Sequence, residues 1–182
     1  MVPEAPLEAT DTGLVQAGPG WFVVNARDAR WREAQGRGAF CPFGDASELT
    51  QLGVNLFALG PGEPMGMYHW EADQEDFLVL SGEAILVVEG EERPLRQWDL
   101  AHCPPGTQHA VVGAGDAPCL VLAVGAREHR GTAEWGGYTV EDAALRHSEG
   151  VERETSDPLE AYASVPTRQA ARCREGALPE TV

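Results

Sequence analysis

Two short segments of the chain carry residue types that can bind a metal ion. The first contains His69 and Glu71, and Glu75 follows four residues later. The second is the turn sequence at 104–106, Pro-Pro-Gly, which is followed by His109. Imidazole nitrogens and carboxylate oxygens are common protein ligands of divalent ions such as manganese, iron and zinc. If both segments line one cavity, these two histidines and two glutamates are the candidate metal ligands.

The spacing of these residues suggests how they could meet. Side chains two apart on an extended strand share a face, so His69 and Glu71 are expected to project together. A bend at residues 72–74 would let Glu75 begin the next strand close to the same point. Proline fixes φ and glycine permits positive φ, so the turn at 104–106 would deliver His109 to the start of a further strand.

The segments around these residues are apolar enough to be buried on at least one face. Two buried carboxylates without a counterion would each cost on the order of several kcal/mol. A divalent cation would remove that cost. The competing prediction is that Arg93 or Arg96 turns inward as the salt-bridge partner, and the sequence leaves both open.

Composition limits the classes of partner. The chain has 182 residues, enough for one domain, and its net charge of -16 argues against binding to nucleic acid or anionic membranes. It has no apolar run long enough to span a bilayer, and residues 1–10 do not resemble an export signal, so a cytoplasmic protein is predicted. The four cysteines form no CxxC pair and are expected to be free thiols. A small molecule is the expected partner.

Local patterns divide the chain into three parts. Residues 1–19 are rich in Pro, Gly, Ala and acids and predict a mobile N-terminal arm. Residues 20–127 contain short apolar runs between turn signals, which favours an all-β sandwich or small barrel. Residues 128–182 predict a helical and irregular tail. The expected strands are 21–25, 53–59, 76–80, 84–89, 99–103, 110–113 and 119–125.

The tail carries two signals for short helices. Thr139 is followed by Asp142 three residues later, which resembles a capping side chain at a helix start. Asp157 precedes Pro158, and proline is favoured at the first helical position. Residues 166–182 are predicted to be irregular and to cover the domain or a neighbouring subunit.

Residues 66–125 resemble the cupin superfamily, whose two motifs are G-x5-H-x-H-x3,4-E-x6-G and G-x5-P-x-G-x2-H-x3-N. The short stretch between the motifs, 83–97, is of the kind found in microbial single-domain members. The resemblance implies an antiparallel β-barrel of six to eight strands, a double-stranded β-helix or jelly roll. It also implies a homodimer. The matching residues are His69, Glu75 and Gly82 in the first motif, and Pro104, Gly106 and His109 in the second.

The chain departs from these motifs at four positions. Glu71 stands where the family usually has its second histidine. Glu63 and Trp98 replace the opening glycines, and Gly113 replaces the final asparagine. The usual set of three histidines and one glutamate therefore cannot form.

Three interpretations of Glu71 stay open. As a fourth ligand, it would complete a site of two imidazoles and two carboxylates. If it points past the ion, then His69, Glu75 and His109 form a two-histidine, one-carboxylate set suited to Fe(II) and oxygen chemistry, with Glu71 as a catalytic acid or base. In the third interpretation, the substitution weakens the site so far that the domain binds its ligand without metal.

Other residues near these motifs have two possible roles. Tyr68, Phe77 and Trp98 are candidates for lining a substrate pocket, although large aromatic side chains can equally be plain core. One of His102 and Cys103 must face inward on a strand and could add a further group to the site. We favour the alternative, in which Cys103 is a core residue and His102 lies at the surface.

The functional prediction is a cupin that binds a divalent metal ion, whether iron, manganese, zinc or nickel. We expect a metal-dependent enzyme of dioxygenase or isomerase type that acts on a small organic molecule. The alternative is a non-catalytic module that binds or senses a small molecule. Cupin-like barrels host both classes, so the resemblance does not decide between them.

Overall fold

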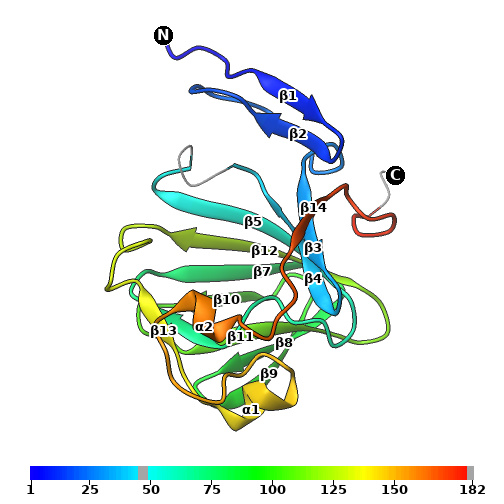
Figure 1. The fold of residues 1–182 in the computed structure, drawn as a ribbon. Helices are drawn as coiled ribbons and strands as arrows, with labels where there is room; N and C mark the ends of the chain where they lie inside the picture. Colours follow the sequence, from blue (N-terminus) through cyan, green and yellow to red (C-terminus); the bar gives the residue numbers. More distant parts are fainter. Residues whose placement is uncertain (45–48, 180–182) are drawn as a thin grey trace.

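The computed structural model describes residues 1–44 and 49–179, and it shows an all-β protein with two large antiparallel sheets (Figure 1). One sheet has seven strands: β3 (Trp31–Ala34), β4 (Arg37–Pro42), β5 (Leu52–Leu59), β7 (Glu75–Ser81), β10 (Leu100–Cys103), β12 (Cys119–Ala126) and β14 (Gln169–Ala171). The other has five: β6 (His69–Glu71), β8 (Glu83–Val88), β9 (Glu91–Arg96), β11 (His109–Ala114) and β13 (Gly136–Tyr138).

The order of strands within each sheet follows from repeated crossings of the chain between the sheets. The seven-stranded sheet has the order β10-β7-β12-β5-β4-β3-β14, and the five-stranded sheet has the order β13-β6-β11-β8-β9. Strands β7 and β8 are consecutive in sequence but lie in different sheets, as do β11 and β12. Within the described residues, no hydrogen-bonded ladder joins the two sheets into a closed barrel.

An apolar core lies between the two sheets. Alternate residues of β7, Phe77 and Val79, are buried in it, which is the period-two pattern of a strand with one inward face. Strand β12 adds Val121, and the facing sheet adds Leu86 and Val111. Complete burial of a side chain of this kind stabilises the fold by about 1.5–3 kcal/mol. This core therefore holds the sheets face to face.

Six of the predicted strands are confirmed as β5, β7, β8, β10, β11 and β12. The strand predicted at 21–25 is wrong: Trp21 forms a single bridge with Glu4, and residues 22–25 belong to no strand. Trp21 and Val23 are exposed, so these apolar side chains are not buried against a sheet. The first 19 residues contain an antiparallel hairpin, β1 (Leu7–Thr10) and β2 (Gly13–Gln16), that the sequence analysis did not predict.

Both short helices of the tail are present, as α1 (Asp142–Arg146) and α2 (Pro158–Ala161). Asp157 caps α2 as predicted, because its carboxylate accepts a hydrogen bond from the Leu159 N–H. The cap of α1 is Glu141 rather than Thr139. Buried alanines of α1 pack against the outer face of the five-stranded sheet.

The last part of the tail also has more structure than predicted. Residues 169–171 form β14, which pairs with β3 at the edge of the seven-stranded sheet. Arg168 precedes this strand and donates hydrogen bonds to the carbonyls of Gly38 and Met65. The four cysteines are free, as predicted. The two short helices of the described chain could not cross a bilayer.

Gly82 makes the crossing from β7 to β8 possible. Its φ is 74°, and a Cβ built on it would lie 2.8 Å from the Cα of Cys119. Gly62 has almost the same φ, 75°, but a Cβ there would meet nothing within 4 Å. The two glycines share the left-handed conformation and differ in available space.

We therefore expect Gly82→Ala to destabilise the protein more than Gly62→Ala. The left-handed conformation should cost either variant about 1–2 kcal/mol. The contact with Cys119 should cost Gly82→Ala at least about 1 kcal/mol more. Urea denaturation measures both losses, and equal losses would show that the close approach at Gly82 is not a constraint on the fold.

Candidate functional site

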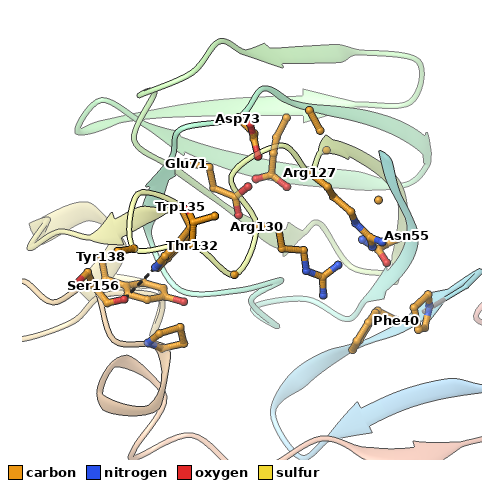
Figure 2. A pocket seen from close by; sticks show the side chains of 18 of the residues that line it. Phe40, Asn55, Glu71, Asp73, Arg127, Arg130, Thr132, Trp135, Tyr138 and Ser156 are labelled. Carbon is orange, nitrogen blue, oxygen red and sulfur yellow. Dashed lines mark hydrogen bonds between the residues drawn. The ribbon is translucent and has the colours of Figure 1, made fainter. Parts of the chain in front are cut away.

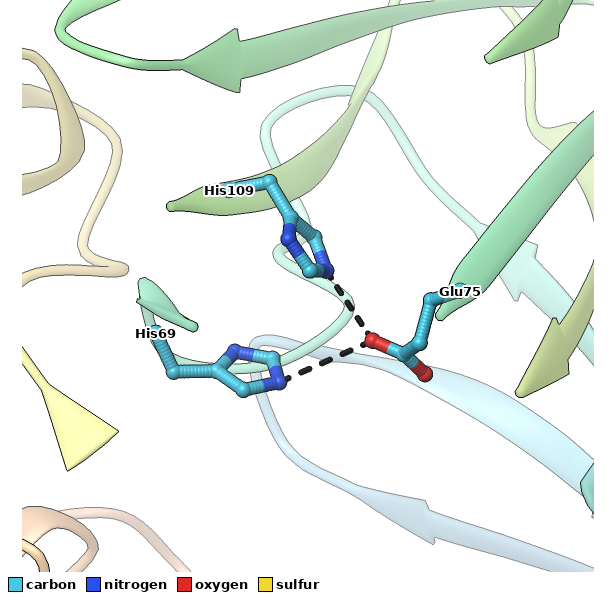
Figure 3. A group of neighbouring side chains, drawn as sticks. All are labelled: His69, Glu75 and His109. Carbon is cyan, nitrogen blue, oxygen red and sulfur yellow. Dashed lines mark hydrogen bonds and ion pairs between the residues drawn. The ribbon is translucent and has the colours of Figure 1, made fainter. Parts of the chain in front are cut away.

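Three potential metal ligands converge at one end of the two facing sheets (Figure 3). His69 on β6 and His109 on β11 are directly paired across neighbouring strands, so their side chains share a face. Glu75 begins β7 in the opposite sheet. One nitrogen of each histidine and one carboxylate oxygen of Glu75 all lie within 4.8 Å of one another.

Backbone carbonyls orient both imidazole rings toward Glu75. Nδ1 of His69 lies 2.7 Å from the carbonyl oxygen of Met67, and Nδ1 of His109 lies 3.0 Å from that of Thr107. A carbonyl oxygen only accepts hydrogen bonds, so each Nδ1 carries the proton and each Nε2 faces the site. Metal-binding histidines in proteins are commonly held in this way.

Glu75 pairs with His109, whose side chain is buried. Their Oε2 and Nε2 atoms are 3.0 Å apart, and only 3% of the His109 side chain is exposed. Burial alone would raise the pKa of Glu75, but the hydrogen bond from His109 and the charges of both histidines outweigh burial and lower this pKa. Burial alone would lower the pKa of His109, but Cys103 and the Glu75 carboxylate raise it to about 10. The negative charge of Glu75 is therefore balanced by the proton on Nε2 of His109, and a divalent ion can take the place of this proton.

The second carboxylate of the predicted ligand set lies beside this group. Oε1 of Glu71 is 3.4 Å from Nε2 of His69, and 28% of the Glu71 side chain is exposed. The converging set consists of His69, Glu75 and His109 without Glu71. Glu71 therefore lies beside the converging set without being part of it.

A cavity of about 970 Å³ opens beside the three residues (Figure 2). Its volume is in the range of sites that bind small organic molecules. Glu71 and Glu75 line it, and aromatic side chains form part of its wall. These aromatic residues are Phe40, Trp135 and Tyr138.

Tyr138 belongs to the same row of side chains as the two histidines. It is paired with His69 across β13 and β6, and the two rings are 5.8 Å apart. Burial raises the pKa of Tyr138, and the nearby Tyr162, Glu71 and Asp157 raise it further. Its hydroxyl is therefore neutral at physiological pH and can donate a hydrogen bond.

The three residues predicted to line a substrate pocket are not among those that line this cavity. Tyr68 is 1% exposed and packs beneath α1, because alternation along the strand turns it away from the face of His69. Phe77 lies in the core between the sheets, with its ring 5.3 Å from that of His109. Trp98 has a φ of 75° in the turn between β9 and β10 and is 67% exposed.

Two alternatives left open by the sequence are resolved. Cys103 lies in the core, and His102 lies at the surface in an ion pair with Asp76, as favoured. Neither candidate arginine compensates the site. Arg93 is largely exposed and pairs with Glu91, and Arg96 is exposed at the end of β9.

The sequence analysis missed the wall that the tail contributes. Trp135 and Tyr138 flank two glycines, and a Cβ on Gly136 would lie 2.1 Å from the carbonyl oxygen of Trp70. A glycine pair between aromatic residues can signal a close approach of two backbones. The partner strand could not be inferred, because it lies far away in the sequence.

A second group of potential ligands lies near the cavity, at Asp73, Glu128 and His129. Asp73 accepts hydrogen bonds from the backbone N–H and from Nδ1 of His129, at 2.9 and 2.8 Å. Burial opposes the charge of Asp73, but these hydrogen bonds lower its pKa. The pair fixes the loop after β12 to the loop before β7.

Comparisons with known proteins agree with this fold. Residues 55–125 match the family model described as the cupin domain. A predicted oxalate decarboxylase from Thermotoga maritima has a TM-score of 0.52 and 20% identity over 57% of this chain and 97% of its own. A Klebsiella pneumoniae protein with a double-stranded β-helix domain has a TM-score of 0.51 and 22% identity over 60% of this chain and 92% of its own.

A sugar phosphate isomerase of the cupin superfamily from Silicibacter pomeroyi is 35% identical, with a TM-score of 0.44. The match covers 56% of this chain and 62% of the isomerase, which is less than two thirds of its length. No curated protein matches the chain. Residues 55–125 match the cupin domain, and the similar solved structures agree with this fold.

The protonated Glu75–His109 pair predicts that metal binding depends on pH. Near neutral pH, binding of Zn²⁺ to metal-free protein should release about one proton per ion, because the ion replaces the proton on His109. Affinity should rise with pH until the pKa of His109, about 10, is reached. Calorimetric titration in buffers with different ionisation enthalpies measures the proton count. Release of no proton would contradict this description of the site.

Proposed function

We propose that this cupin binds a divalent metal ion and uses it in an isomerase-type or dioxygenase-type reaction on a small organic molecule. The observation that carries the proposal is the convergence of the two histidine Nε2 atoms on the Glu75 carboxylate at the wall of the cavity. Because the carbonyls of Met67 and Thr107 already hold both rings, little rearrangement is needed to bind an ion.

The donor set fits a divalent ion. His69, Glu75 and His109 would hold it through two imidazole nitrogens and one carboxylate oxygen. This set with open positions is used by non-haem Fe(II) proteins, and the same donors accept manganese, zinc and nickel. When bound, the ion supplies polarisation of a substrate oxygen, and a redox-active ion also supplies electron transfer.

Glu71 is the proposed acid or base. Its carboxylate lines the cavity and lies next to His69 without belonging to the converging set. It can therefore take a proton from a substrate bound in the cavity or return one to it. The neutral hydroxyl of Tyr138, on the same wall, can donate a hydrogen bond to a substrate oxygen.

Three further features stay predictions from the resemblance and the composition. They are closure of the two sheets as a cupin barrel, a homodimer, and a cytoplasmic location. Light scattering at micromolar concentration tests the second of these, and a monomeric mass would contradict it.

The metal content of variants distinguishes the proposed ligands from Glu71. In protein purified without an affinity tag and supplied with Mn²⁺ or Fe²⁺, His109→Ala and Glu75→Ala should retain at most about a tenth of the wild-type metal, because each loses a ligand. Glu71→Gln should retain nearly all of it. His102→Ala is the matched control, since that histidine lies at the surface. Elemental mass spectrometry measures the content, and failure of the wild-type protein to bind any divalent ion would refute the proposal.

Turnover is tested with the same Glu71→Gln variant. The metal-loaded wild-type protein is incubated in D₂O with small oxo and hydroxy acids, and proton NMR and an oxygen electrode follow hydrogen exchange and oxygen consumption. We expect one of these activities in the wild type and a loss of at least about 100-fold in Glu71→Gln, since general acid–base catalysis contributes about 10²–10⁴-fold. Ligand binding without either activity would instead support a non-catalytic module.

A further inference from the structure

Part of the cavity wall is basic. Arg32, Arg127 and Arg130 all line it, in a chain with 13 basic residues, all arginine, against 29 acidic ones. Arg127 and Arg130 follow β12, and Figure 2 shows the guanidinium group of Arg130 pointing into the cavity. Guanidinium groups that lie close together are stabilised by negative charge beside them.

The carboxylates that share the cavity have other partners. Glu75 contacts the two histidines, and Glu71 lies beside His69. Both oxygens of Asp73 accept hydrogen bonds from His129, and Asp157 accepts one from the Leu159 N–H. In residues 1–44 and 49–179, no ion pair involves Arg127 or Arg130. One nitrogen of Arg127 donates to the carbonyl of Leu49 at 2.5 Å, which leaves its other N–H groups available.

The charge of Arg130 acts on Arg127. Burial lowers the pKa of Arg127, and the positive charge of Arg130 lowers it further. Two guanidinium groups close enough to repel are stabilised when an anion lies between them. The planar fork of N–H donors matches the oxygens of a carboxylate or a phosphate, with two hydrogen bonds to each group.

We propose that Arg127 and Arg130 form an anion-binding subsite that takes the carboxylate or phosphate group of a small organic anion. The body of this molecule would lie against Phe40 and Trp135, and its opposite end would carry an oxygen that reaches the metal site. The position of that second end rests on the proposed function. The anion subsite itself depends only on the arginines.

The test measures binding of inorganic phosphate and of succinate by calorimetry, on full-length protein stripped of metal by chelation and dialysis. Without metal, neither probe can bind as a metal ligand. We expect saturable binding of at least one probe in the wild type. Arg130→Gln should weaken it at least about tenfold, which corresponds to about 1.4 kcal/mol. Arg130→Lys, which keeps the charge and loses the fork, should weaken it less.

Arg96→Gln is the matched control, because Arg96 is exposed at the end of β9 and does not line the cavity. Its affinity for both probes should equal that of the wild type. Arg130 makes no hydrogen bond within the described residues, so its substitution should leave the unfolding temperature unchanged. The double variant Arg127→Gln/Arg130→Gln should bind neither probe.

The outcomes separate the two anion sources. Phosphate binding alone assigns a phosphate group, succinate binding alone assigns a carboxylate, and binding of both assigns a site that accepts either. No saturable binding, or equal binding by Arg130→Gln and wild type, would overturn the inference. Metal uptake is measured on separate portions of the same preparations, after Mn²⁺ is added back. Loss of anion binding in Arg130→Gln with normal metal uptake supports this subsite. Normal anion binding by the wild type without any metal uptake refutes the metal proposal alone.

Discussion

The buried contact between Glu75 and His109 is the constraint on which the candidate site depends. A charged carboxylate in a largely enclosed place costs several kcal/mol without a partner, so positive charge or a metal ion beside Glu75 stabilises its ionised form. The partner comes from the opposite sheet: Glu75 begins β7, whereas His109 begins β11. The site therefore requires the two sheets to pack in one arrangement, and the apolar core between them enforces it.

Several backbone features place the three side chains. The N–H of Gly106 donates to the carbonyl of Glu71 at 2.8 Å, which fastens the Pro-Pro-Gly turn to β6 and puts His109 next to His69. On the other sheet, Gly125 is paired with Glu75. A Cβ on Gly125 would lie 3.0 Å from Oε1 of Glu75, so the absence of a side chain leaves room for the carboxylate.

The sequence predicted those parts of the site that depend on short-range pattern. The alternation of apolar residues predicted six of the twelve strands of the two sheets, and motif spacing selected His69, Glu75 and His109. The same alternation rule, applied to Tyr68, would have placed it on the face opposite His69 and removed it from the substrate-binding candidates. The strand predicted at 21–25 failed because apolar composition does not ensure a partner strand.

The other parts of the cavity depend on pairings between distant segments. Tyr138 meets His69 only because β13 returns to the edge of β6, and Arg130 enters the cavity from the loop after β12. Neither contact has a local signal in the sequence. These distant segments provide aromatic side chains and arginines of the cavity wall, which determine the kind of ligand that the cavity can bind.

X-ray absorption spectroscopy of the zinc-loaded protein reports the atoms that surround the ion. We expect scattering from two imidazole rings and a first coordination sphere of nitrogen and oxygen alone. Fewer than two imidazoles, or a sulfur ligand at about 2.3 Å that would place Cys103 in the coordination sphere, would contradict this expectation.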